Sequence, residues 1–93
     1  MKLNLQKETE YASLFRALGS PMRLWIVRQL LRQEHCVGEL VDSSGVCFAS
    51  TSRHLAHLRK VGIIAARREG REVWYGINRA TLRKVILILS EKR

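Results

Sequence analysis

Two extended runs late in the chain limit the folds that are open to it. Residues 62–68 and 71–77 flank Glu69-Gly70, which predicts a β-hairpin with basic residues at and beside its tip. The segments on either side of these runs have helical spacing instead. A chain of 93 residues has room for one small domain. We therefore expect a single domain over residues 1–93, mainly α with one β-hairpin.

Capping residues mark the ends of three predicted helices. Apolar side chains in residues 11–18 follow i, i+3, i+4, i+7 spacing until Gly19. Ser20-Pro21 supplies an N-cap hydroxyl and a proline at the first helical position of a second helix. Asn78 can cap a final helix that reaches Lys92. The apolar side of the second helix is expected to comprise Leu24, Ile26, Val27, Leu30 and Leu31.

Between the second helix and the hairpin, the sequence predicts two further helices. A short helix is expected over residues 37–42, with a turn at residues 43–45. A longer helix follows over about residues 48–61, and Gly62 ends it. A short helix, a tight turn with glycine and a longer helix form a helix-turn-helix, and a basic hairpin directly after it makes a winged one.

The longer helix presents two different faces. At 100° per residue, Thr51, Leu55 and Leu58 fall together and are expected to face the core. The opposite face is almost free of acids, which suits the DNA major groove because small side chains allow close approach and arginine can bind guanine through two hydrogen bonds. A solvated amphipathic helix is the alternative, and the adjacent basic hairpin argues against it. The outward and flanking residues are Ala49, Ser50, Ser52, Arg53, His54, Ala56, His57 and Lys60.

The charge of the chain also favours a polyanionic partner. Seventeen basic and eight acidic residues give a net charge of +9, and residues 53–93 hold eleven of the basic residues but only three of the acids. A concentrated positive surface commonly binds nucleic acid. A generic basic protein kept soluble by charge repulsion is the other reading of the composition.

Four segments of the chain together resemble the ArsR/SmtB family of small bacterial and archaeal repressors. They are Ala17–Leu24, Gly38–Leu40, Ser52–Arg59 and Arg67–Tyr75, and the resemblance covers about residues 11–78. It implies a winged-helix homodimer that binds an operator, blocks transcription and leaves when an inducer binds. A dimer would place two recognition helices about 34 Å apart, which predicts an imperfect palindrome in the DNA.

The resemblance also assigns roles to individual residues. Ser50, Ser52, Arg53 and His54 match the family's recognition helix, and the face derived above adds His57 and Lys60. Arg67, Arg68 and Arg71 match the wing, where they would hold phosphate or the minor groove.

The final helix carries more apolar side chains than one small domain should bury, because Leu87 and Ile88 widen its apolar stripe. We read the excess as a dimer surface, as the resemblance implies for the first and last helices; the alternative is a final helix wholly inside the monomer. The candidate interface residues are Tyr11, Leu14, Phe15, Leu82, Val85, Ile86 and Leu89.

The inducer is the least constrained part of the sequence reading. Where arsenic-sensing members have two cysteines, this chain has Cys36 and Gly38, and one thiolate beside His35 is a poor arsenic site. Other members of the family bind zinc-like ions with His, Asp and Glu side chains between their last helices. That site is absent here, since residues 79–93 contain no His or Asp and only Glu91. We therefore expect no cofactor. The alternative is a soft metal or metalloid bound at Cys36.

Cys36 and Cys47 remain candidate sensor thiols. Cys47 stands at the start of the recognition helix, where thiols tend to be reactive. Oxidation or persulfidation there would put bulk or charge beside a phosphate. The alternatives are that both thiols are small buried hydrophobes, or that an organic or protein inducer binds in the dimer crevice. A disulfide between them is not expected, because a helix and a turn separate them.

Other functions and locations are less favoured by the residues. No nucleophile, base and orienting group occur together, so we expect no enzyme. The polar residues 1–10 and the short apolar run 85–89 predict no membrane segment and a cytoplasmic protein with reduced thiols. Two rivals stay open: a winged helix that binds protein, and a DNA-binding protein without sequence preference or inducer response.

Overall fold

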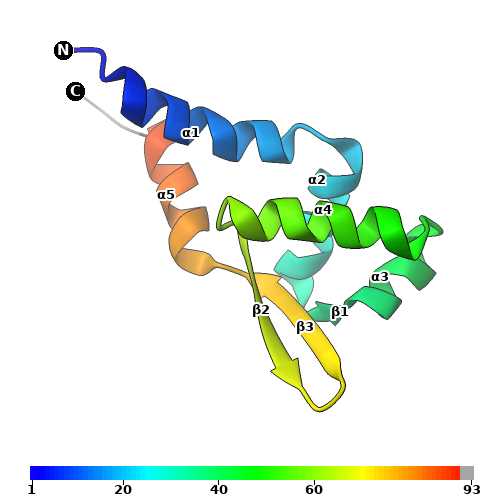
Figure 1. Ribbon diagram of the computed structural model, residues 1–93. Coiled ribbons are helices and arrows are strands. Elements are labelled where there is room, and N and C mark those ends of the chain that lie inside the picture. Colours follow the sequence, from blue (N-terminus) through cyan, green and yellow to red (C-terminus); the bar gives the residue numbers. More distant parts are fainter. Residues whose placement is uncertain (91–93) are drawn as a thin grey trace.

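The computed structural model describes residues 1–90 as five helices and a small sheet (Figure 1). The last helix was predicted to reach Lys92, and its final residues, with Glu91, lie outside the described residues. The hairpin projects away from the helices, and both termini lie on the side of the molecule away from the hairpin tip (Figure 1). The elements are α1 (Leu5–Leu18), α2 (Pro21–Arg32), β1 (His35–Cys36), α3 (Val37–Ser44), α4 (Phe48–Lys60), β2 (Ile64–Glu69), β3 (Glu72–Ile77) and α5 (Arg79–Ser90).

Side-chain caps start three of the helices. Asn4 Oδ1 accepts a hydrogen bond from the backbone N–H of Lys7, and Ser20 Oγ accepts one from the N–H of Arg23. Asn78 Oδ1 accepts from the N–H of Ala80 at 3.1 Å. Each cap satisfies an N–H that has no partner inside its helix. The predicted starts at Ser20 and Asn78 are confirmed.

A left-handed glycine separates the two helices of the helix-turn-helix. Gly45 has φ = 73°, a conformation that other residues adopt only at a cost, and its N–H donates to the carbonyl of Val41 at 2.9 Å. The predicted turn at residues 43–45 was too long, because Ser43 and Ser44 still belong to α3. Gly45 therefore ends α3 and redirects the chain into α4.

β3 is the central strand of a three-stranded antiparallel sheet with the order β1-β3-β2. The hairpin is confirmed, with Glu69 paired to Glu72 across the turn that contains Gly70. The short strand β1 was not predicted: His35 and Cys36 pair with Tyr75 and Trp74. A two-residue strand has no periodicity to recognise. β1 leads directly into α3, so the sheet holds the wing against the start of the helix-turn-helix.

The core forms where α2, α4 and the base of the hairpin meet. Thr51, Leu55 and Leu58 of α4 are buried as predicted. On α2, the prediction fails for Leu24 and Leu31, which are exposed because they lie outside the stripe that reaches α4. The buried hydrophobic residues are Leu14, Ala17, Ile26, Val27, Leu30, Leu40, Leu55, Leu58, Ile63, Ile64 and Val85.

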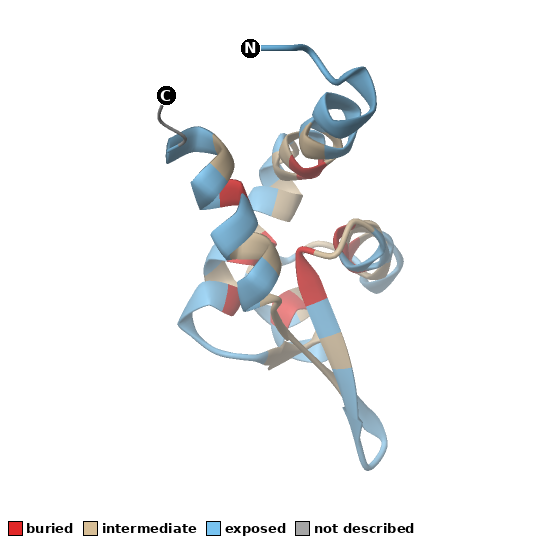
Figure 2. Ribbon diagram, turned by 90° about the vertical axis from the view of Figure 1, so that its left-hand side faces the viewer, coloured by how far each residue is buried: buried red, intermediate tan, exposed pale blue. Residues whose placement is uncertain are grey.

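α5 divides its apolar residues between the core and the surface. Leu14 of α1 and Val85 are only 6% and 8% exposed within the single chain, so the structure assigns these two candidate interface residues to the core. Ile86, Leu87 and Leu89 are 55%, 62% and 72% exposed, and most of the outer side of α5 is open to solvent (Figure 2). A final helix wholly inside the monomer is therefore wrong.

We predict that Leu58→Ala lowers the free energy of unfolding by about 3 kcal/mol, because a fully buried leucine leaves a cavity when it is truncated. Leu3→Ala is the matched control, since Leu3 is exposed and precedes α1; it should change stability by less than about 0.5 kcal/mol. Urea unfolding followed by circular dichroism, at one protein concentration, measures both. Equal losses would contradict this placement of the core.

Candidate nucleic-acid interface

The outward face of α4 is exposed and carries positive charge. Ala49, Arg53, Ala56 and Lys60 are all exposed, and none of the first-turn residues of α4 is acidic. The burial of the opposite face fixes this side of the helix toward solvent. Ser50, Ser52 and His57 are half-buried at its margins. A surface of this kind, narrow and with small side chains beside an arginine, matches the requirements of a helix that enters the major groove.

His54 differs from the other residues of this face. It is half-buried, and its Nδ1 accepts a hydrogen bond from Nη1–H of Arg23 at 3.2 Å. Burial lowers the pKa of His54 below its ordinary value, and the nearby positive charges of Arg23 and Arg53 lower it further. The sequence pattern placed His54 on the flank of the helix but gave no sign that α2 would contact it.

In the wing, Arg67 is engaged by two carboxylates. Its Nε–H and Nη2–H donate to Oε1 of Glu34 at 3.2 and 2.8 Å, and its Nη1–H donates to Glu69. The hydrogen bonding of Arg67 to Glu34 is the main reason that the pKa of Arg67 lies above its ordinary value, and the same interaction holds the pKa of Glu34 low. Arg67 was predicted as a DNA contact, whereas its guanidinium here ties β2 to the segment between α2 and β1.

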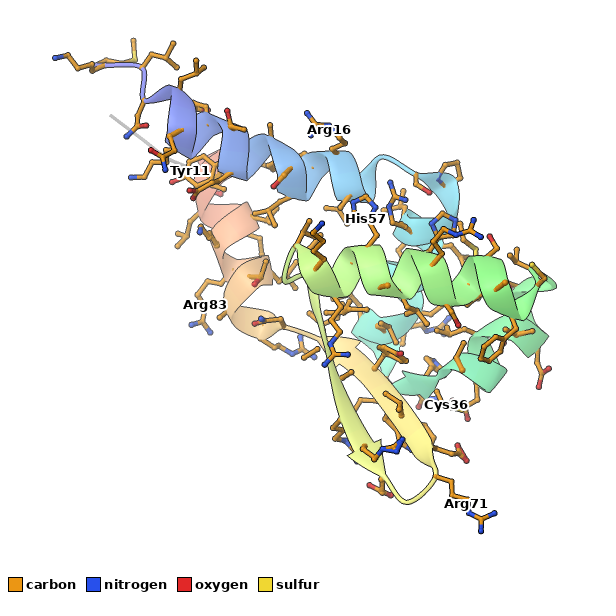
Figure 3. The ribbon with its side chains drawn as sticks, in the orientation of Figure 1. Tyr11, Arg16, Cys36, His57, Arg71 and Arg83 are labelled. Carbon is orange, nitrogen blue, oxygen red and sulfur yellow. The ribbon has the colours of Figure 1, made fainter. Side chains whose placement is uncertain are left out.

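Arg68 and Arg71 are the wing arginines that remain available. Arg68 pairs with Val73, two positions along from the pair of Ala66 and Tyr75, so its side chain leaves the same face of the hairpin as Tyr75. Tyr75 packs against the core and, with residues of α4, lines a shallow depression. Arg68 is thus on the side of the hairpin that faces α4. Arg71 extends from the tip of the hairpin (Figure 3).

Sequence reasoning missed three residues that shape this surface. Arg59 is exposed on α4 beside Lys60, and helical spacing could have found it at the edge of the outward face. Arg23 and Glu34 act through residues more than thirty positions away, and no local pattern indicates such contacts.

Both cysteines are free thiols in different surroundings. Cys47 is exposed and occupies the N-cap position of α4 without a side-chain hydrogen bond. Cys36 is half-buried and lines an open cavity of about 810 Å³ together with Phe48, Ser52 and Trp74. The two thiols thus stand on different elements, Cys36 in β1 and Cys47 at the start of α4.

The surroundings of His35 and of the other possible ligands do not form a metal site in the described residues. His35, which stands beside Cys36, has its Nδ1 2.9 Å from Oε1 of Glu39. Over residues 1–90, no cluster of three or more His, Cys, Asp or Glu side chains could hold a metal ion. Over the same range, no helix has the length and apolar character needed to cross a membrane.

Comparisons with known proteins identify the helix-turn-helix as a family feature. Residues 20–66 match the family described as bacterial regulatory protein, arsR family, a span that runs from the start of α2 into β2. The repressor SmtB of Mycobacterium tuberculosis is 40% identical over 74 residues, 80% of this chain. An HTH-type transcriptional regulator of Methanocaldococcus jannaschii is 32% identical over 94% of this chain and 99% of its own length.

Solved structures agree in fold. An ArsR-like transcriptional regulator from Rhodococcus matches with a TM-score of 0.84 and 28% identity, over 92% of this chain and 81% of its own. HlyU from Vibrio cholerae matches with a TM-score of 0.80 and 29% identity, over 92% and 94% of the two chains. The winged helix-turn-helix prediction is confirmed. The chain spans only 55% of the length of SmtB, yet the match holds across the whole helix-turn-helix, and the chain belongs to the ArsR family of bacterial regulatory proteins.

Proposed function

We propose that the protein is a sequence-specific DNA-binding transcriptional repressor that acts as a homodimer in the cytoplasm. The observation that carries this proposal is the outward face of α4, where Arg53 stands between the small residues Ala49 and Ala56 with no acidic neighbour on the helix. Relatives named as repressors, such as SmtB and the biofilm growth-associated repressor of Xylella fastidiosa, support repression as the outcome of binding.

The proposed complex divides the work between α4 and the wing. α4 would enter the major groove, where the fork of Arg53 can donate to O6 and N7 of guanine, with Ser50, Ser52, His57 and Lys60 at the margins. Arg68 and Arg71 would hold the neighbouring phosphates or minor groove. Arg67 would act indirectly, since Glu34 and Glu69 already accept three of its five N–H donors.

The homodimer is proposed from the apolar surface of α5. Ile86, Leu87 and Leu89 are exposed on one short helix, and exposed apolar area of this kind usually has a protein partner. The neighbouring α1 contributes Tyr11, whose ring lies 5.8 Å from Nζ of Lys84, and Phe15. A symmetric pair of chains would present two α4 helices to two half-sites of a palindrome.

The first test is to select bound duplexes from a randomised library and to measure their affinity by fluorescence anisotropy at fixed salt. A repressor should prefer the selected sequence over random DNA by about 10³-fold or more. Binding without preference would indicate a non-specific DNA-binding protein, and no binding would indicate a winged helix that contacts protein. Either result overturns the proposed function.

We predict that Arg53→Ala weakens binding to the selected duplex by about 1–3 kcal/mol and relaxes its sequence preference, because a base contact is lost. Arg68→Ala should weaken binding to all duplexes alike and reduce the salt dependence of log Kd by about one unit, because a phosphate contact releases a counterion. Arg16→Ala, on the exposed side of α1 (Figure 3), is the matched control for loss of charge. If Arg53→Ala behaves like Arg16→Ala, α4 is not the reading helix.

Leu89→Glu is expected to yield monomers with poor DNA affinity, since it places a carboxylate in the proposed apolar interface. Sedimentation velocity at micromolar concentration reports the oligomeric state. Arg83→Glu adds a carboxylate to an exposed residue of the same helix and should leave the dimer intact. A dimer that survives Leu89→Glu would remove this part of α5 from the interface.

Cys47, an exposed thiol at the start of α4, is the candidate site for release by an inducer. A polysulfide would transfer one sulfur atom to the Cys47 thiolate, forming a persulfide and leaving the polysulfide one atom shorter. We predict that this treatment weakens operator binding because the added group lies at the start of α4, and that Cys47→Ser abolishes the effect while Cys36→Ser retains it. Unchanged affinity after treatment, with modification verified by mass spectrometry, would assign both thiols a structural role.

A further inference from the structure

Arg23 occupies a position where a positive charge is electrostatically unfavourable. It is the third residue of α2, and the amino end of a helix already carries a partial positive charge. Within the described part of the chain, none of the ion pairs includes Arg23. Its guanidinium instead donates Nε–H to the carbonyl of Ala17 at 2.7 Å and Nη1–H to Nδ1 of His54 at 3.2 Å. Two neutral acceptors therefore hold this cation.

These two acceptors belong to different helices. Ala17 is the penultimate residue of α1, so its carbonyl is one of the four at the end of a helix that lack a partner inside the helix. A cation there also interacts favourably with the negative end of α1. His54 lies in the middle of α4. The side chain of Arg23, at the start of α2, thus joins the end of α1 to the middle of α4.

The contact with Arg23 fixes the protonation of the imidazole ring. A guanidinium has donors only and stays charged, so Nδ1 of His54 must act as the acceptor. The single N–H of the neutral ring is then at Nε2. The pKa of His54 is lowered, first by burial and then by the charges of Arg23, Arg53 and His57, and this shift favours the neutral ring.

The second nitrogen of this ring, Nε2, is not fully buried. Nε2 of His54 has no hydrogen-bond partner among residues 1–90, where no buried polar side-chain atom lacks one; Nε2 must therefore be accessible. It belongs to the residue that follows Arg53, on the side of α4 toward α2. An N–H donor of fixed direction at the edge of a DNA-reading helix is suited to a phosphate oxygen.

We propose that Arg23 is a positioning residue for DNA recognition, which orients His54 so that its Nε2–H donates to a phosphate oxygen of the operator. This inference rests on the proposed function. The bond sets the register of α4 on the DNA without adding charge, so it contributes to affinity while leaving the salt dependence unchanged. Arg23 acts through His54 and does not itself contact the DNA.

Acid should break this arrangement. A second proton on His54 would occupy Nδ1 and remove the acceptor for Arg23, and the charged groups that act on the ring, Arg23, Arg53 and His57, are all basic. Because the pKa of His54 is lowered in the fold, its neutral form is the one that folding favours. The contribution of neutral His54 to folding stability is complete above the ordinary histidine pKa of about 6.5. This contribution is lost as the pH falls from about 6.5 through the lowered pKa of His54.

A double-mutant cycle on operator binding at pH 7.5 tests the proposal. Arg23→Met keeps the apolar stem and removes the donors, and His54→Ala removes the ring. We expect each change to weaken binding about 5–15-fold, with no further loss in the double variant and with the wild-type salt dependence kept in His54→Ala. Losses that multiply in the double variant would overturn the proposal, because Arg23 would then act without His54.

His54→Gln provides a second variant that preserves folding and a donor near the position of Nε2. It should keep more affinity than His54→Ala and become insensitive to Arg23→Met. Thermal unfolding of every variant identifies losses that come from the fold alone. If His54→Gln binds no better than His54→Ala, although its melting temperature equals that of the wild type, the donor role of Nε2 is wrong.

A readout without DNA separates this proposal from the function on which it rests. The ring of His54, followed by NMR in the free protein, should titrate below the ordinary histidine value in the wild type and closer to it in Arg23→Met. An unchanged titration would overturn the contact itself. If the wild-type protein prefers no duplex sequence, the proposed function is wrong. If it does prefer one, but the losses of affinity from Arg23→Met and His54→Ala multiply in the double variant, only the role of Arg23 is wrong.

Discussion

The burial of one side of α4 is the constraint on which the rest of the structure depends. Thr51, Leu55 and Leu58 are completely or almost completely removed from solvent, and the hydroxyl of Thr51 donates to the carbonyl of Val46 at 3.4 Å, which satisfies the one polar group among them. With these three side chains inside, rotation of the helix about its axis is no longer free. The residues on the opposite side of α4 must therefore lie at the surface, where a binding partner can contact them.

The sequence was sufficient for features that depend on neighbouring residues. The caps at Ser20 and Asn78, the hairpin around Gly70 and the two faces of α4 all follow from spacing or from a single residue type, and all are present. The boundaries of α3 were less predictable, because serine is common at helix ends and in turns alike.

What the sequence could not provide are the contacts between distant segments. The pairing of β1 with β3, the engagement of Arg67 by Glu34 and the bond from Arg23 to His54 join residues about 30 to 40 positions apart. Each of these contacts gives a residue a structural partner that the adjacent sequence does not indicate. Arg67 resembled Arg68 in sequence, and only the fold separates a side chain held by carboxylates from one that is available.

The order of the sheet has a consequence for the behaviour of the protein in concentrated solution. β2 lies at one edge of the sheet, with β3 as its only partner within residues 1–90, and an open edge can pair with the strand of another chain. Here Arg67, Arg68 and Glu69 occupy the outer half of that edge. Charged side chains on an edge strand are one of the means by which proteins discourage such pairing, so the charged residues of the wing also oppose aggregation through its sheet.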